Sequence, residues 1–180
     1  MRRTIAVDCD GVLVAVHKII DEVWAERGLP FQHDPHVTDF DYRKCVGNLA
    51  KELAYGVFQR PDLYDSPYLE LEEGAMAGLC ALRASQYNVI AVSSPFAQHA
   101  GSKWDLLRRL GFEHDEIFLT GAKHEIRWDI LIDDRAETVL ETPPCRDALL
   151  FAQPWNRWVN EYPANVRRVG SWDDILAILC

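Results

Sequence analysis

The sequence predicts an α/β fold, a doubly wound parallel sheet with a small helical cap inserted after the first strand. Short runs of apolar and β-branched residues alternate with segments in which apolar residues recur every three or four positions. This order is typical of parallel strands joined by crossover helices. Residues 31–72 break the alternation, because they are rich in aromatic residues and contain Pro61 and Pro67. We therefore expect a core domain of residues 1–14 and 73–180 and a cap of residues 15–72.

The first expected strand covers residues 4–7, Thr-Ile-Ala-Val, and acidic residues and a glycine follow it. A short apolar run that ends in this way is typical of a buried parallel strand. Residues 15–27 have helical spacing, and Gly28-Leu29-Pro30 ends that helix. Within the cap, residues 46–55 predict a further helix.

The rest of the core follows the same alternation. Residues 73–85 predict an amphipathic helix, residues 88–92 a buried strand, and residues 102–110 a helix that ends at Gly111. The remaining strands are expected at residues 117–119, 128–132, 148–151 and 166–169, and the closing helix at residues 172–179. Together these elements provide enough strands for one open parallel sheet.

Composition narrows the classes of function. The 180 residues carry a formal net charge of −9 and contain no block of lysine and arginine, so long nucleic acid and anionic membranes are poor partners. The five scattered cysteines form no CxxC pair, which argues against a disulfide framework or a zinc knuckle. No apolar run approaches the ~20 residues of a membrane span. We expect a cytoplasmic protein with a small-molecule substrate, and these features are compatible with a homodimer.

Side chains that can bind a ligand or take part in a reaction lie at the ends of three of the expected strands. They are Asp8 and Asp10, Ser93 and Ser94, and Asp133 and Asp134, with Lys123 in the connection before the last of these strands. Ligands of an open α/β sheet bind outside the carboxyl ends of its strands, where these groups would meet. Several carboxylates in one place repel each other unless a cation lies between them, and oxygen ligands favour Mg²⁺. The sequence therefore predicts a magnesium site.

Such a site suits phosphoryl transfer. Asp8 would attack phosphorus, and Asp10 would protonate the leaving oxygen and then deprotonate the incoming water. The metal and Lys123 would neutralise the phosphate oxygens, which a serine hydroxyl would orient. Gly11 would allow the tight turn that points both acids at the substrate.

Each of these features alone has a simpler interpretation. The Asp-x-Asp-Gly motif also occurs in turns and calcium loops, but an EF-hand loop needs glycine at its sixth position and glutamate at its twelfth. Here glycine is fourth and Ile19 is twelfth. Asp133-Asp134 alone fits a helix cap, Ser93-Ser94-Pro95 a turn, and Lys123 a solvated side chain. The specific signal is that all of them occur in order at strand ends.

These motifs resemble those of the haloacid dehalogenase superfamily, and more narrowly the 5′(3′)-deoxyribonucleotidase family. The similar segments are Asp8-Cys9-Asp10-Gly11-Val12, Val92-Ser93-Ser94-Pro95, Phe118-Leu119-Thr120 with Lys123, Leu131-Ile132-Asp133-Asp134-Arg135, and Arg168-Val169-Gly170-Ser171-Trp172-Asp173-Asp174. The resemblance spans residues 4–14, about 73–135 and about 148–179, whereas the cap matches only weakly.

The resemblance implies a Rossmann-like core. It also implies a nucleoside monophosphate substrate that is hydrolysed through an aspartyl-phosphate intermediate. Asp8 is then the nucleophile and Asp10 the acid/base, while Ser93, Ser94 and Lys123 bind phosphate. Mg²⁺ would be held by Asp8, the Asp10 carbonyl and Asp134, with Asp133 binding it directly or through a neighbour. The chain departs from the family at Val16 and at Lys44-Cys45-Val46, where relatives offer aromatic residues to the base. These departures affect base and sugar selectivity.

Two other functions stay open. One is the same hydrolysis on another small phosphomonoester, such as a sugar phosphate or a 3′-phosphate end. The other is a catalytically silent module that binds a phosphate ligand.

Four further features carry weaker expectations. His33 and His36 flank Pro35, which favours a surface loop over a metal site, and the aromatic residues of the cap favour a small core over base stacking. Residues 153–158 predict a loop packed by its tryptophans, with Asn156 or Arg157 at the active site as the alternative. Strand alternation points Cys9 into the core.

Overall fold

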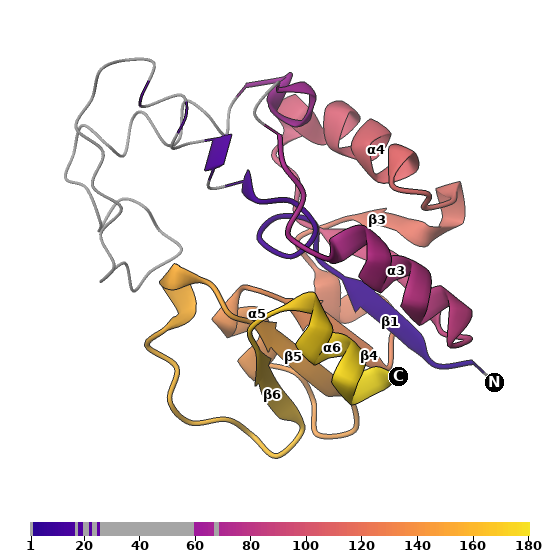
Figure 1. Cartoon of the computed structure of the whole chain (residues 1–180), viewed down its shortest axis with the longest axis vertical. Helices are drawn as coiled ribbons and strands as arrows, with labels where there is room; N and C mark the ends of the chain where they lie inside the picture. Colours follow the sequence, from indigo (N-terminus) through magenta and orange to yellow (C-terminus); the bar gives the residue numbers. More distant parts are fainter. Residues whose placement is uncertain (1, 17, 20–21, 23–24, 26–59, 67–68) are drawn as a thin grey trace.

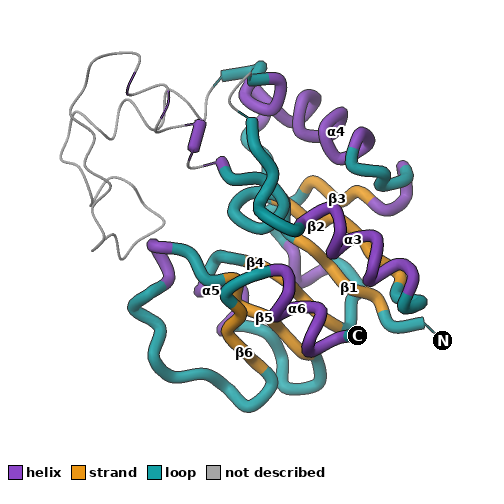
Figure 2. The backbone as a smooth tube through the Cα atoms, in the orientation of Figure 1, coloured by secondary structure: helices purple, strands orange, loops and turns teal. Residues whose placement is uncertain are grey.

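The computed structural model describes residues 2–16, 18–19, 22, 25, 60–66 and 69–180. Its centre is a six-stranded sheet with the order β3-β2-β1-β4-β5-β6, and every pairing in it is parallel. The strands are β1 (Thr4–Val7), β2 (Asn88–Ser93), β3 (Ile117–Leu119), β4 (Ile130–Asp133), β5 (Asp147–Phe151) and β6 (Val166–Val169). This arrangement confirms the predicted doubly wound α/β fold (Figures 1 and 2).

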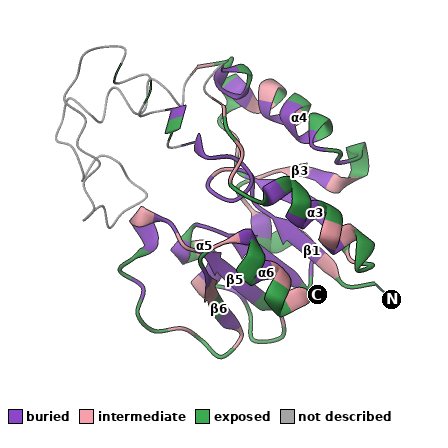
Figure 3. Ribbon diagram, viewed as in Figure 1, coloured by how far each residue is buried: buried purple, intermediate pink, exposed green. Residues whose placement is uncertain are grey.

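Helices cover both faces of the sheet. The helices are α3 (Ala75–Ala84), α4 (Ala100–Arg109), α5 (Ala136–Leu140) and α6 (Trp172–Leu179). Ile5 and Val7 of β1 belong to the core cluster that includes residues of α3, α4 and α6, whereas Ala6 belongs to a second cluster with α5. Side chains of a strand alternate between faces, so each strand contributes to two apolar layers. The four central strands are accordingly buried along almost their whole length, whereas the edge strands β3 and β6 are buried only in part (Figure 3).

Two strands end one residue later than the sequence predicts, and both extensions reach site residues. Strand β2 includes Ser93, and β4 begins at Ile130 rather than at Trp128 and ends at Asp133. Trp128 lies before β4, and its indole N–H donates to the Lys123 carbonyl at 3.1 Å. The side chains of Ser93 and Asp133 are therefore held inside the sheet, at 1% and 0% exposure.

A tight turn follows β1 and is fixed by long-range contacts. Gly11 has φ +72°, a left-handed conformation that favours glycine, and its N–H donates to the Val14 carbonyl at 2.8 Å. The Trp172 indole of α6 donates to the Val12 carbonyl at 2.9 Å. The turn is thus anchored from the helix layer behind it.

The predicted cap is described only near its two ends, and its helix at residues 46–55 lies outside the described residues. Val16 and Ile19 are buried in the same core cluster as Leu63 and Tyr64. Leu63–Asp65 form a short 3-10 helix, η2, that the sequence does not predict. The division into core domain and cap stays a prediction. Within the described part of the chain, none of the helices has both the length and the apolar character that crossing a membrane requires.

Candidate active site

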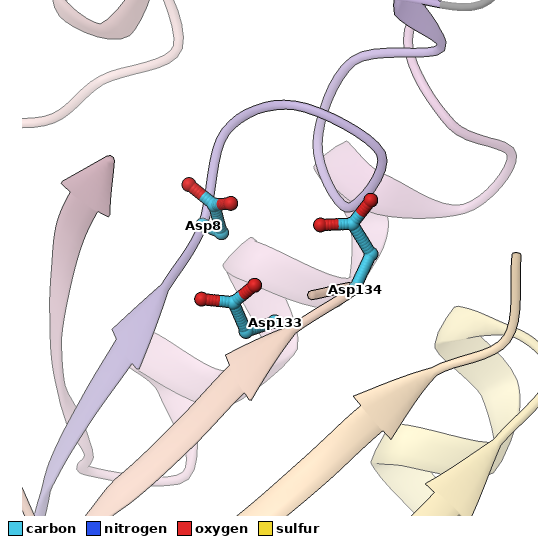
Figure 4. A group of neighbouring side chains, drawn as sticks. All are labelled: Asp8, Asp133 and Asp134. Atoms are coloured by element: carbon cyan, nitrogen blue, oxygen red, sulfur yellow. The ribbon is translucent and has the colours of Figure 1, made fainter. Parts of the chain in front are cut away.

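Three carboxylates meet at the carboxyl edge of the sheet. Asp8 directly follows β1, and Asp133 and Asp134 stand at the end of β4, which pairs with β1 through Val7 and Ile132. One oxygen from each carboxylate lies within 4.8 Å of the others (Figure 4). All three residues are buried, so their charges are poorly screened by water. The structure therefore brings the ends of β1 and β4 together, as we expect from the sequence.

Lys123 places an ammonium against two of these carboxylates. It belongs to a short 3-10 helix, η5 (Lys123–Glu125), and its Nζ lies 2.9 Å from Asp8 Oδ2 and 2.7 Å from Asp133 Oδ2. Burial alone would lower the pKa of Lys123, but Asp133 and Asp8 raise it above its usual range. The side chain is therefore charged. The remaining oxygens of the two acids accept backbone N–H groups, Asp8 from Cys9 at 2.7 Å and Asp133 from Arg135 at 2.8 Å.

One ammonium does not balance three buried carboxylates. Burial raises the pKa of Asp133 to about 6, against the opposing effect of Lys123. Burial, and then the charges of Asp133 and Asp8, raise the pKa of Asp134 well above its usual range. A hard divalent cation would relieve this repulsion, and an all-oxygen donor set fits Mg²⁺. Asp8, Asp133 and Asp134 are thus the side chains that could hold such an ion.

The second predicted acid, Asp10, faces a different set of groups. Its Oδ2 lies 2.7 Å from Nζ of Lys103, and its Oδ1 accepts from the Tyr64 hydroxyl at 2.7 Å. Burial raises the pKa of Tyr64 well above its usual range, and the Asp10 charge adds to the effect, so the phenol is a neutral donor. The Asp10 side chain is only 18% exposed. Both of its oxygens are therefore held by named donors.

Lys103 is one of the site residues that sequence reasoning missed. It is fully buried on α4, and its Nζ also lies 3.0 Å from Ser93 Oγ and 3.4 Å from the Ser94 carbonyl. A signal was present, because Lys103 shares the helical spacing of Leu106, Leu107 and Leu110 and so lies on the apolar face. A lysine on such a face is costly unless it is paired. Tyr64 lies between Pro61 and Pro67, where no helical spacing in the sequence marks it as a site residue.

The two predicted phosphate-binding serines differ in their surroundings. Ser93 is buried, and its hydroxyl accepts from Lys103. Ser94 is exposed, and its hydroxyl donates to the Thr120 carbonyl at 3.2 Å. The Lys103 ammonium contacts both Ser93 and Asp10 and so brings these two side chains together. That Ser93 and Ser94 bind phosphate stays a prediction.

The loop after β5 donates hydrogen bonds to Asp134. Trp155 and Asn156 lie in a short 3-10 helix, η6 (Pro154–Asn156), and both are buried, whereas Arg157 and Trp158 are exposed. The Trp155 indole donates to Asp134 Oδ2 at 2.9 Å, and the Asn156 amide donates to the Asp134 carbonyl at 2.8 Å. Of the two tryptophans predicted to pack this loop, Trp155 is buried and Trp158 is 44% exposed, and Asn156 also reaches Asp134. Cys9 is buried in the core cluster, as strand alternation predicts.

The family model for 5′ nucleotidase, deoxy (pyrimidine), cytosolic type C protein (NT5C) matches residues 2–180. The chain belongs to the NT5C family. This match confirms the predicted resemblance and spans the cap, which the sequence motifs alone did not cover. A comparison with curated proteins found no match.

Solved structures share the fold of this NT5C-family chain. A HAD family hydrolase from Deinococcus radiodurans R1, with bound phosphate and sodium, has a TM-score of 0.59 at 20% identity, over 99% of this chain and 95% of that one. CbbY from Rhodobacter sphaeroides, in complex with phosphate, has a TM-score of 0.56 at 13% identity, over 99% of both chains. The HAD-hydrolase YfnB from Bacillus subtilis, bound to magnesium, has a TM-score of 0.56 at 13% identity, over 99% and 98%.

Family and fold together make this protein a phosphatase-type hydrolase of the HAD superfamily. Of the two departures noted in the sequence, Val16 is buried in the core, and residues 44–46 lie outside the described residues. His33, His36 and the aromatic residues between positions 24 and 58 also lie outside them. The effect of these two departures on base and sugar selectivity therefore stays a prediction from sequence.

Proposed function

We propose that the protein is a Mg²⁺-dependent phosphomonoesterase that hydrolyses (deoxy)nucleoside monophosphates to nucleoside and phosphate. The observation that carries the proposal is the buried cluster of Asp8, Asp133 and Asp134 with Lys123 against it. Membership of the NT5C family supports a nucleotide as the substrate. The ion would be held by Asp8, Asp134 and the Asp10 carbonyl, with Asp133 beside them, and when bound it neutralises the charge of the phosphate oxygens.

Asp8 is suited to be the nucleophile. Its carboxylate stands at the tip of β1, oriented by Lys123 on one oxygen and by the Cys9 N–H on the other. Attack on phosphorus forms the Asp8–phosphorus bond and breaks the bond to the nucleoside oxygen, which leaves an aspartyl-phosphate. Lys123 and Ser93 would hold the phosphate oxygens during this step, because charge grows on those oxygens in the transition state.

Asp10 is suited to move the protons. In the first step it gives its proton to the departing nucleoside oxygen, and in the second it takes a proton from the attacking water. That water breaks the Asp8–phosphorus bond, so phosphate leaves and the Asp8 carboxylate is regenerated. Lys103 and Tyr64 hold the Asp10 carboxylate in place, which is the form that takes the proton from water in the second step.

The test is phosphate release at neutral pH, with and without Mg²⁺, from deoxy- and ribonucleoside 5′- and 3′-monophosphates and from several sugar phosphates. We expect Mg²⁺-dependent release from nucleotides, and Asp8→Asn should lower kcat by roughly 10⁴-fold or more, as loss of a nucleophile does. Asp147→Asn is the matched control, because it removes only an exposed ion pair with Arg3.

The other outcomes separate the open alternatives. Release from sugar phosphates alone would keep the chemistry and replace the substrate. Silence across the panel, from folded protein that binds Mg²⁺, would favour the binding module. Full activity of Asp8→Asn would refute the mechanism.

A further inference from the structure

The loop after β5 contacts both the turn after β1 and the end of β4, the two segments that carry the acids of the site. The Gln153 amide donates to the Gly11 carbonyl at 2.8 Å, and so reaches the turn that carries Asp8 and Asp10. Two residues later, the Trp155 indole donates to Asp134 Oδ2 at 2.9 Å. The loop therefore spans from the turn after β1 to the end of β4, and none of these contacts is required by the proposed chemical steps.

The residue after Trp155 is held by several buried or partly buried hydrogen bonds, which fix the loop that carries the indole. Asn156 is fully buried, and its amide donates to the carbonyls of Asp134 at 2.8 Å and Phe151 at 2.7 Å. Arg168 in turn donates to the Asn156 side-chain oxygen at 2.7 Å and to its carbonyl at 3.0 Å. Buried hydrogen bonds that support one another fix a geometry better than a single exposed bond does.

Steric contacts confine the Asp134 carboxylate as well. A Cβ at Gly11 would lie 2.3 Å from Asp134 Oδ2 and 3.1 Å from the Trp155 ring, so the carboxylate and the indole both pack against the bare backbone of this glycine. Oδ2 is thereby held between Gly11 and the indole N–H. Figure 4 shows one oxygen of Asp134 turned toward Asp8 and Asp133.

We infer that Trp155 is a positioning residue of the metal site. It fixes Asp134 through Oδ2 and so presents Oδ1 to the ion, in an oxygen set that is formed before the ion arrives. An indole is a neutral donor with no acceptor atom, so it orients the carboxylate without cancelling the charge that attracts the cation. A lysine in the same place would compete with the metal. This inference rests on the proposed Mg²⁺ site.

The test is Mg²⁺ binding by isothermal titration calorimetry, in the absence of substrate, to the whole chain and two variants. Trp155→Phe removes the N–H and keeps an aromatic ring, and we expect its Kd for Mg²⁺ to rise by about 10-fold or more. Tyr87→Phe is the matched control, because it also removes one donor from an aromatic side chain, the hydroxyl that donates to the Leu179 carbonyl at 3.0 Å, and Tyr87 lies just before β2, at the edge of the sheet opposite the site. We expect its Kd to stay within about twofold of wild type.

Equal Mg²⁺ affinity of Trp155→Phe and wild type would overturn the inference and leave the proposed function intact. Wild-type protein that binds no Mg²⁺ would overturn the metal site itself, and the inference with it. If Trp155→Phe fails to fold, the indole is replaced by the isosteric ring of β-(3-benzothienyl)alanine, which lacks only the N–H. An unchanged Kd for that protein would equally reject a positioning role.

Discussion

Lys103 is the residue whose burial most needs an explanation. A fully buried ammonium loses its hydration, which costs several kcal/mol unless carboxylate and hydroxyl oxygens replace the water. Asp10 and Ser93 supply those oxygens at 2.7 and 3.0 Å, and the net effect raises the pKa of Lys103 although burial alone would lower it. Lys103 therefore links Asp10, in the turn after β1, to Ser93, at the end of β2.

Replacing this ammonium should disturb the chemical step more than substrate binding. Lys103→Met keeps the length of the side chain and removes its charge, so Asp10 loses the partner on Oδ2 and keeps only Tyr64. A misplaced acid/base group lowers the rate by about 100-fold. We expect kcat to fall by about that factor with little change in KM, measured by steady-state phosphate release.

The control for this variant lies on the same helix. Arg108→Met also removes a cation from α4, but Arg108 is 43% exposed and pairs with Glu113 at the surface. Its kcat should match wild type. A Lys103→Met protein that is folded and fully active would show that the ammonium serves only the packing of α4.

At the scale of elements, the site depends on how closely α6 approaches α3. Trp172 of α6 lies over Gly78 of α3, where a Cβ would stand 2.1 Å from the indole ring. The same indole holds the Val12 carbonyl in the turn after β1. A single glycine thus allows a helix–helix contact that anchors the turn bearing Asp8 and Asp10.

Gly78→Ala should therefore destabilise the fold although alanine favours helices. The gain in helix propensity is about 1 kcal/mol, but overpacking against a buried indole costs typically 1–3 kcal/mol. We expect a net loss of up to about 2 kcal/mol in the free energy of unfolding, measured in urea. Gly101→Ala in α4 is the control, since nothing lies within 4 Å of the added Cβ, and it should be neutral or stabilising. Equal effects of the two substitutions would contradict the packing argument.

The elements themselves were largely predictable, and the contacts between them were not. Thr4–Val7 and Ile117–Leu119 lie where the apolar runs placed them, because parallel strands are marked by local sequence. Trp155 and Tyr64 reach the acids only through the tertiary fold, from loops whose sequences show no periodicity. Lys103 lies between these cases, since its helical face is visible in the sequence and its partner is not.

At the scale of the whole molecule, the sheet gathers acids on a chain whose net charge is already −9. The pKa of Asp133 is about 6 in the folded protein and near 3.8 when unfolded, so the folded state holds this proton more tightly. Its contribution to stability is complete below about pH 4 and is lost as the pH rises through 6. Asp134 acts in the same direction, because burial raises its pKa as well.

Mg²⁺ should reverse this loss, because it binds the deprotonated cluster in competition with protons. At a Mg²⁺ concentration of 100 times the Kd measured at pH 7, binding stabilises the fold by about 2.7 kcal/mol, which raises Tm by roughly 5–10 °C for a chain of this size. At pH 5 the same concentration should raise Tm by less than half as much. Thermal unfolding at both pH values, with and without Mg²⁺, measures the difference, and Asp134→Asn should abolish the increment at either pH. An equal increment for wild type at pH 5 and pH 7 would mean that the ion does not bind at these buried acids, because a surface site built from ordinary carboxylates is already deprotonated at pH 5.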